Sequence, residues 1–305
     1  MKYKNIPTTD LYVSNIALGC MRISKMTTDE VEKLILKALE LGINLFDHAD
    51  IYGGGKSESL FGEVLKRNPP LRSQMIIQTK CGIKNGYYDN SKQYLIESVK
   101  QSLKRLQTNY LDVLLIHRPD ALMDVDEVGE AFEYLHSSGM VRYFGVSNMN
   151  SWQIELLQKY VKQKIIINQL QLSIVHSLLI DEGLNVNMRN SEAINRSGDF
   201  INYSRLNEIT IQAWSVLQAS WEDGTFLNNP KYHSLNESLL LLANKYQVTP
   251  AAIAISWILR HPAKIQAIVG TTSIKHLVEI SKASLIELER KEFYDLYLSV
   301  DRKLP

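Results

Sequence analysis

The feature that most constrains this chain is a recurring pair of segments, a short apolar run followed by a longer amphipathic stretch, which continues from residue 16 almost to the end. Eight of the runs have the length and composition of buried strands, at 16–19, 43–47, 75–80, 111–117, 141–147, 165–169, 210–214 and 264–269. The stretches between or after them have helical periodicity, at 28–41, 57–67, 91–106, 127–137, 151–160, 235–246, 250–260, 273–280 and 285–298. This alternation of strands and helices therefore predicts an α/β fold built from repeated strand–helix units.

Eight such units favour a (β/α)8 TIM barrel, which typically takes about 250 residues before insertions. The chain has 305 residues and no Pro/Ser-rich linker, so we expect a single barrel domain spanning 1–305. A doubly wound sheet is the alternative. Residues 3–13 predict an N-terminal β-hairpin cap, while 175–207 and 216–233 predict long βα loops, the first with a little helix.

Helix ends are marked by capping residues. Thr27 and Glu30 form the pattern of a capping box, and Asn150 precedes the helix expected at 151–160. Ser57 and Asp126 occupy equivalent positions before two other expected helices. We expect all of these helices to begin at those residues.

Composition excludes several classes of function. The 34 Lys and Arg residues nearly balance the 33 Asp and Glu residues, so no net charge indicates a nucleic acid or an anionic membrane as partner. The two cysteines, Cys20 and Cys81, form no metal-binding spacing and no disulfide framework, and no apolar run approaches the roughly 20 residues of a membrane span. We expect a soluble cytoplasmic protein without a bound metal.

Polar residues with distinct chemistry stand at the ends of three expected strands. Asp47 ends the second strand, Lys80 the third and His117 the fourth, and Tyr52 follows in the glycine-rich loop after Asp47. Active sites of βα barrels lie at the carboxyl ends of strands. An ammonium beside Tyr52 would lower the pKa of its phenol by stabilising the phenolate, and Asp47 would hold Lys80 in place. The set suits protonation of a carbonyl oxygen, although Asp47 and Lys80 alone fit an ordinary buried ion pair equally well.

Five short motifs, in order along the chain, resemble the aldo-keto reductase family. They are Phe-Asp-His-Ala-Asp-Ile-Tyr-Gly at 46–53, Gln-Thr-Lys at 78–80, Leu-Ile-His at 115–117, Gly-Val-Ser-Asn at 145–148, and Gln169. The amino-acid sequence at 249–257 and 259–263 most resembles the bacterial oxidoreductase branch of this family. The resemblance implies a barrel that binds NADPH in an extended form without a dinucleotide-binding domain.

The same resemblance implies roles for individual residues. Asp47, Tyr52, Lys80 and His117 would form a catalytic tetrad with Tyr52 as the general acid/base. The cofactor would be held by Ser147, Asn148 and Gln169 at its carboxamide, by Trp214 against the nicotinamide ring, by Ser215 and Leu217 along the pyrophosphate, and at the adenosine end by Gly270, Thr271, Thr272, Lys275, His276 and Glu279. His276 stands where relatives commonly carry an arginine against the 2′-phosphate, and Ile280 stands where an asparagine is common. NADP(H) is the expected cofactor and NAD(H) the alternative.

Residues flanking the expected mouth define the substrate hypothesis. Met21, Tyr88, Arg118 and Trp221 would give a partly aromatic pocket for a small aldehyde or ketone. The leading hypothesis is thus an NADP(H)-dependent carbonyl reductase. Two alternatives are a nicotinamide-binding regulatory subunit, which some members of this family are, and a lyase or isomerase that uses Lys80 as a Schiff base.

Overall fold

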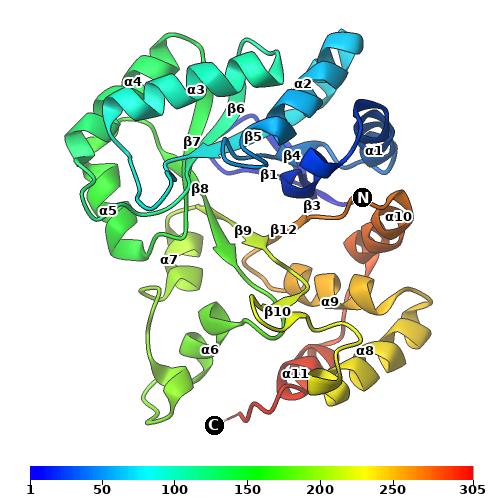
Figure 1. The fold of residues 1–305 in the computed structure, drawn as a ribbon. Coiled ribbons are helices and arrows are strands. Elements are labelled where there is room, and N and C mark those ends of the chain that lie inside the picture. The colour runs from blue at the N-terminus through cyan, green and yellow to red at the C-terminus, as the bar shows by residue number, and fades with distance from the viewer. Residues whose placement is uncertain (305) are drawn as a thin grey trace.

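The computed structural model describes residues 1–304, and its centre is a closed barrel of parallel strands (Figure 1). Around the ring the strands are β3 (Ile16–Gly19), β4 (Leu45–Asp47), β5 (Ile76–Cys81), β6 (Leu111–Ile116), β7 (Val141–Ser147), β8 (Ile165–Gln171), β9 (Thr210–Trp214) and β12 (Gln266–Val269). Each strand pairs with its successor, and β12 closes the ring against β3. This arrangement confirms the predicted (β/α)8 barrel.

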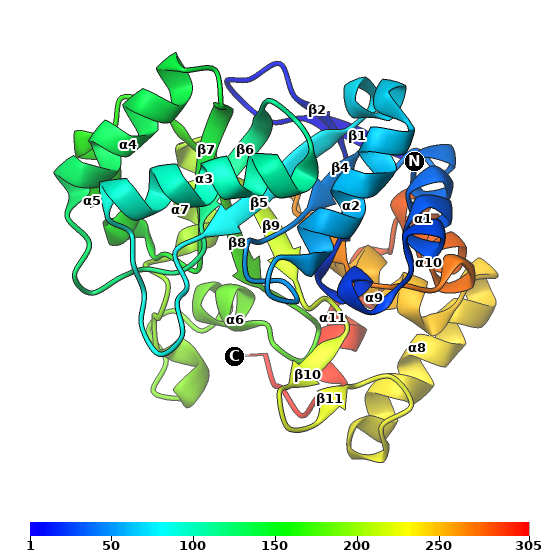
Figure 2. The same ribbon diagram turned by 45° about the horizontal axis from the view of Figure 1, so that its top comes forward.

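Helices surround the barrel in both views (Figures 1 and 2). They are α1 (Thr28–Glu40), α2 (Lys56–Arg67), α3 (Lys92–Leu106), α4 (Val125–Ser137), α5 (Ser151–Tyr160), α6 (Leu178–Leu184), α7 (Phe200–Leu206), α8 (His233–Tyr246), α9 (Pro250–Leu259), α10 (Ile274–Ser281) and α11 (Arg290–Leu298). Each main helix turns an apolar face inward, as with Phe132 of α4, which stacks on Phe144 of β7 at 4.2 Å between ring centroids. Within residues 1–304, none of the helices combines the length and apolar character that crossing a membrane requires.

The long βα segments contain more regular structure than loops alone. The segment 175–207 carries α6 and α7, in agreement with the little helix expected there. The segment 216–233 contains an unexpected hairpin of β10 (Gln218–Ser220) and β11 (Gly224–Thr225), which projects beyond the end of β9 in Figure 2. These two segments build up the rim on one side of the barrel.

Several expected helix starts are wrong, including that of α8, which begins at His233 and not at residue 235. α2 begins after Gly55 rather than at Ser57, because the preceding glycines turn the chain with positive φ angles and Gly55 itself has φ 90°. α4 begins two residues early because Asp124, not Asp126, accepts the first free N–H groups of the helix. α11 begins after Glu289 rather than at residue 285. The capping box at Thr27 and the cap at Asn150 are confirmed.

The N-terminal hairpin closes the bottom of the barrel, as predicted. β1 (Tyr3–Asn5) and β2 (Tyr12–Ser14) pair antiparallel. The hairpin contributes three fully or almost fully buried side chains to the core inside the ring: Ile6, Leu11 and Val13. There they join strand residues including Ala17, Leu45, Val113, Leu115 and Ile167. These apolar side chains fill the part of the barrel interior next to the hairpin.

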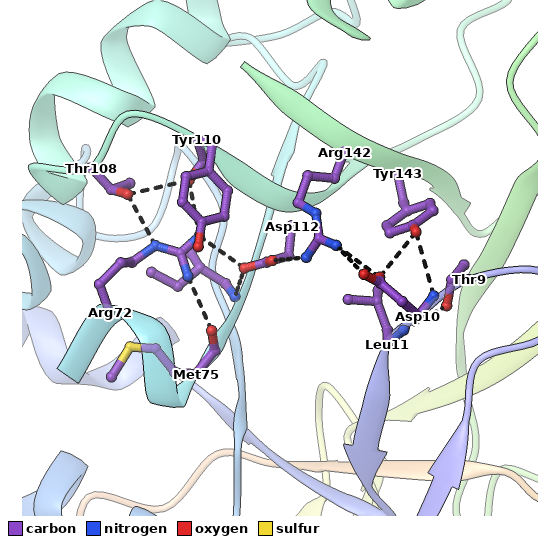
Figure 3. A network of polar contacts seen from close by, with 11 residues as sticks. Thr9, Asp10, Leu11, Arg72, Met75, Thr108, Tyr110, Asp112, Arg142 and Tyr143 are labelled. Carbon is purple, nitrogen blue, oxygen red and sulfur yellow. Dashed lines mark hydrogen bonds and ion pairs between the residues drawn. The ribbon is translucent and has the colours of Figure 1, made fainter. Parts of the chain in front are cut away.

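Asp112 of β6 connects this strand with its neighbours β5 and β7, and Arg142 extends the network to the hairpin (Figure 3). Its carboxylate is almost fully buried and accepts hydrogen bonds from Arg72 Nη2 at 2.8 Å, from the main-chain N–H of Ile77 at 2.9 Å and from Arg142 Nη1 at 2.9 Å. Arg142 also forms a bidentate pair with Asp10 in the hairpin turn, with both contacts at 2.7 Å. Removing a buried carboxylate that accepts several hydrogen bonds leaves its donors without a partner and its cations without a counter-charge.

We predict that Asp112→Ala lowers the free energy of unfolding by about 3 kcal/mol, because two guanidinium groups and a main-chain N–H lose their acceptor. Asp10→Ala is the matched control, since Asp10 makes a solvent-exposed pair and should cost about 1 kcal/mol or less. Urea unfolding followed by circular dichroism measures both values. Equal losses for the two variants would contradict the assigned role of Asp112.

Candidate active site

The candidate site centres on a buried ion pair at the carboxyl ends of β4 and β5. Lys80 Nζ lies 2.7 Å from both carboxylate oxygens of Asp47 and 2.8 Å from the main-chain oxygen of His48. Both charged side chains are 3% exposed or less. Burial disfavours the charge on Lys80, but Asp47 and Tyr52 outweigh that effect and raise the pKa of Lys80 above its ordinary value. The ammonium is therefore held charged at neutral pH.

Tyr52 is carried over this pair by the β4–α2 loop. Asp50 N donates to the Lys80 carbonyl at 2.9 Å and Tyr52 N to that of Ala49 at 3.1 Å, so the loop is fastened to the end of β5. Lys80 Nζ lies 5.2 Å from the centroid of the Tyr52 ring. Burial raises the pKa of Tyr52, and the opposing effect of Lys80 does not overcome it. The expected lowering of this pKa is wrong here because desolvation of the phenolate dominates.

His117 follows β6 and completes the group. Its ring meets that of Tyr52 edge to face, with 6.2 Å between centroids. Burial, reinforced by the positive charges of Lys80 and Arg118, lowers the pKa of His117 to about 2. Its Nδ1 is buried and has no hydrogen-bond partner within residues 1–304. The structure thus brings together the three residues predicted at the strand ends and Tyr52 of the loop, with a neutral imidazole among them.

A second polar set lies at the ends of β7, β8 and β9. Ser147 Oγ donates to the main-chain oxygen of Gln169 at 2.9 Å, and Asn148 Nδ2 donates to Ser147 Oγ at 2.7 Å. Trp214 Nε1 donates to Asn148 Oδ1 at 3.2 Å. The side chain of Gln169 reaches back to the first set, because its Nε2 donates to Asp47 Oδ1 at 2.9 Å. The two sets are therefore joined by one hydrogen bond.

The predicted substrate residues separate into two groups. Arg118 and Trp221 both meet Trp214: the guanidinium carbon lies 5.9 Å from the indole centroid, and the two indoles lie 6.5 Å apart. Met21 and Tyr88 are each 45% exposed, and no hydrogen bond or aromatic contact within residues 1–304 joins them to the four strand-end residues. Arg118, Trp214 and Trp221 thus form one cluster beyond the carboxyl ends of β6 and β9.

The remaining predicted cofactor residues lie on two neighbouring segments. Ser215 and Leu217 follow β9, and the Leu217 carbonyl accepts a hydrogen bond from Thr225 Oγ1 at 2.8 Å. After β12, the chain runs through Gly270, Thr271 and Thr272 into α10, where Ser273 caps the helix and its first residues are exposed, among them Lys275 and His276. Ile280, in contrast, is buried, and Glu279 is half-buried.

Sequence reasoning missed several residues that support these groups. Arg22 Nη1 donates to the Gly270 carbonyl at 2.7 Å and fastens the segment before α10 to the β3–α1 loop. Gln78 donates to Asp47 Oδ1 at 2.6 Å, and Gln212 and Gln266 continue a buried chain from there. For Gln212 and Gln266 the available signal was a single glutamine in an otherwise largely apolar strand, where a polar side chain needs partners.

These residues fit a nicotinamide cofactor. Gln169 Oε1 receives no hydrogen bond from residues 1–304, although the Nε2 of the same amide is fully used. Together with Ser147 and Asn148 it offers hydroxyl and amide groups of the kind that recognise a carboxamide. Lys275 and the N-terminus of α10 offer positive charge for a phosphate. Residues 1–304 contain no group of three or more His, Cys, Asp or Glu side chains placed to hold a metal ion.

Comparison with known proteins assigns the family. The model of the aldo/keto reductase family matches residues 15–297. The chain belongs to the aldo/keto reductase family. It is 33% identical to oxidoreductase YdhF of Escherichia coli over 294 residues, which cover 92% of this chain and 91% of YdhF. It is also 33% identical to a 6-dehydroglucose reductase of Agrobacterium fabrum over 300 residues, covering 94% of each chain.

A solved structure supports the fold of this aldo/keto reductase. The crystal structure of the thermostable aldo-keto reductase Tm1743, described in complex with the inhibitor epalrestat, superposes with a TM-score of 0.78. The match covers 98% of this chain and 100% of the other at 24% sequence identity. The resemblance inferred from the motifs is thereby confirmed, including its bacterial oxidoreductase relatives.

We predict that the His117 ring of this aldo/keto reductase stays neutral from pH 8 down to pH 5. A pKa lowered to about 2 means that the imidazolium form appears only in much stronger acid. The measurement is ¹⁵N–¹H NMR of the histidine rings across this range, with the His117 signals assigned by their loss in His117→Gln. A titration midpoint between pH 5 and 8 would contradict the prediction.

Proposed function

We propose that the protein is an NADP(H)-dependent oxidoreductase that reduces an aldehyde or ketone to an alcohol. The observation that carries the proposal is the Asp47–Lys80 pair beneath the Tyr52 ring, with the neutral His117 ring against its edge. In this proposal the carbonyl oxygen of the substrate lies between one weak acid, Tyr52, and one neutral hydrogen-bonding ring, His117. Proton donation to that oxygen is the chemistry such a set performs.

The proton comes from Tyr52 in the direction of reduction. Its raised pKa keeps the phenol protonated at neutral pH, as a donor requires. The charged Lys80 stabilises the phenolate that remains after transfer, and His117 orients the carbonyl oxygen. A reduced nicotinamide held by Ser147, Asn148 and Gln169 would supply the hydride for the carbonyl carbon. In oxidation of an alcohol, the Tyr52 phenolate accepts the proton instead.

The cofactor residues in this proposal are those at the ends of β7–β9 and before α10. Ser147, Asn148 and Gln169 hold the carboxamide, and Trp214 offers its indole face to the ring. The segment at 270–279 binds the adenosine phosphate. Lys275 supplies the positive charge there, because His276 stands at the position where relatives commonly have an arginine. Because an imidazole binds phosphate more weakly than a guanidinium, we assign the NADP(H) preference to Lys275, Thr271 and Thr272.

The Schiff-base alternative is disfavoured by the state of Lys80. An amine must lose its proton to attack a carbonyl, whereas Lys80 donates to three oxygens and has a raised pKa. The names of the relatives also favour reduction, since 6-dehydroglucose reductases are among them. Two free, buried cysteines support a reducing compartment such as the cytoplasm. We propose one catalytic domain across 1–305.

We predict that Tyr52→Phe lowers kcat for carbonyl reduction by about 10²- to 10³-fold, because the general acid is removed. The Kd for NADPH should change by less than about threefold, since the fold and cofactor residues are kept. Tyr143→Phe is the matched control, because Tyr143 lies in the hairpin network at the opposite end of the barrel. Normal turnover in Tyr52→Phe would refute the proposed mechanism.

We predict that NADPH binds at least about tenfold more tightly than NADH, measured by quenching of tryptophan fluorescence. Lys275→Met should remove most of this difference by weakening NADPH alone, because NADH has no 2′-phosphate. His276→Ala should leave the difference within about twofold, since an imidazole lacks the paired N–H donors with which a guanidinium binds phosphate. Equal binding in the native protein would mean that the cofactor preference is absent.

A further inference from the structure

The interior of the barrel contains a layer of buried amides that the tetrad alone does not explain. Gln78 of β5, Gln169 of β8, Gln212 of β9 and Gln266 of β12 are all 2% exposed or less. Each carries a donor end and an acceptor end, and both must be satisfied when the side chain is buried. Which way each of the four amides points its NH₂ group and its oxygen is therefore set by the groups around it.

The lower end of the layer is anchored by a group that can only accept. Gln266 Nε2 donates to the Ser14 carbonyl at 2.5 Å, which turns Gln266 Oε1 toward the next amide. Gln212 Nε2 donates to this oxygen at 2.8 Å and to Gln78 Oε1 at 3.1 Å. Both N–H bonds of Gln212 are thus committed, and its Oε1 must serve as an acceptor.

The upper end of the layer also terminates on an acceptor, the Asp47 carboxylate. Gln212 Oε1 accepts from Gln78 Nε2 at 2.9 Å and from Gln169 Nε2 at 3.1 Å. The same two nitrogens donate to Asp47 Oδ1, at 2.6 Å and 2.9 Å respectively. Both N–H groups of the Gln169 side chain therefore donate to acceptors inside the barrel.

A reversed Gln169 amide is excluded by the same contacts. Its oxygen would then face the Asp47 carboxylate and the Gln212 carbonyl, so that three acceptors would meet without a proton between them. Replacing Gln212 removes one of the two acceptors of Gln169 Nε2, so that Asp47 alone holds the amide and its plane can turn about that single contact. Replacing Gln266 removes one of the two acceptors of Gln212 Nε2 and leaves Gln212 held through Gln78. The orientation of Gln169 therefore depends on residues that lie below it in the barrel.

We propose that Gln212 and Gln266 are positioning residues that hold Gln169 with its Oε1 toward the cofactor, where it accepts a hydrogen bond from the carboxamide N–H of nicotinamide. This inference rests on the proposed function, because it concerns how the same site recognises its cofactor. It also links the carboxamide to the proton donor, since Asp47 binds both Gln169 and Lys80. Through Gln169, the barrel core thereby favours binding of a cofactor whose carboxamide carries an N–H group.

The test compares binding of NADP⁺ with binding of its 3-acetylpyridine analogue, whose methyl ketone has no N–H to donate. Quenching of tryptophan fluorescence gives the two Kd values without turnover. The native protein should bind NADP⁺ about tenfold more tightly, because an unpaired buried acceptor costs about 1–3 kcal/mol. In Gln212→Leu the ratio should fall to within about threefold, since a mobile Gln169 that is held by Asp47 alone distinguishes the two groups poorly.

Two further variants separate positioning from general damage to the barrel. Gln266→Met cuts the layer at Ser14, far from the mouth, and should also reduce the ratio. Ile211→Ala alters the same strand on the face that packs against the helices, and it should keep the native ratio even though it opens a cavity. If Gln212→Leu does not fold, Gln266→Met decides the test.

The outcomes distinguish this inference from the proposed function. Native ratios in both Gln212→Leu and Gln266→Met, or equal binding of the two cofactors by the native protein, would overturn the positioning role while leaving the reductase assignment intact. A reduced ratio in Ile211→Ala equal to that in Gln212→Leu would overturn it as well. A native protein that binds neither dinucleotide would overturn the proposed function itself.

Discussion

The ion pair between Asp47 and Lys80 is the interaction on which the site depends. Two charges removed from water cost several kcal/mol each to desolvate, and only close geometry with further hydrogen bonds offsets that cost. Here the pair is bidentate, and the His48 carbonyl and two glutamine amides supply the additional contacts. A cation held so firmly below Tyr52 can stabilise a phenolate without itself moving or losing its proton.

The barrel makes this pair possible because it has two chemically different ends. The lower end is filled by the hairpin side chains and is locked from outside by Asp112 and its two arginines. The upper end collects the polar residues, since parallel strands all release their chains in the same direction. Between them, the glutamine layer carries a hydrogen-bonded connection from the Ser14 carbonyl to the Asp47 carboxylate. The polar site is therefore supported from beneath rather than placed on an apolar floor.

Local pKa values show how burial changes the roles of the same groups. A phenol near an ammonium is expected to become more acidic, yet burial raises the pKa of Tyr52. The same burial keeps His117 neutral, because an imidazolium would have to share a desolvated site with Lys80. In the proposed mechanism, this arrangement suits a tyrosine that gives up its proton only when a substrate oxygen arrives, beside an imidazole that stays uncharged.

The sequence by itself determined the succession of strands and helices and the residues at the strand ends, because periodicity and capping are local properties of the chain. It correctly placed Asp47, Lys80 and His117 at three adjacent strand ends of a βα barrel. It did not predict the partners of Gln212, and it misjudged the direction of the Tyr52 pKa shift. Those features were decided only by the tertiary structure, because desolvation and the satisfaction of buried amides depend on neighbours up to 252 residues apart along the chain.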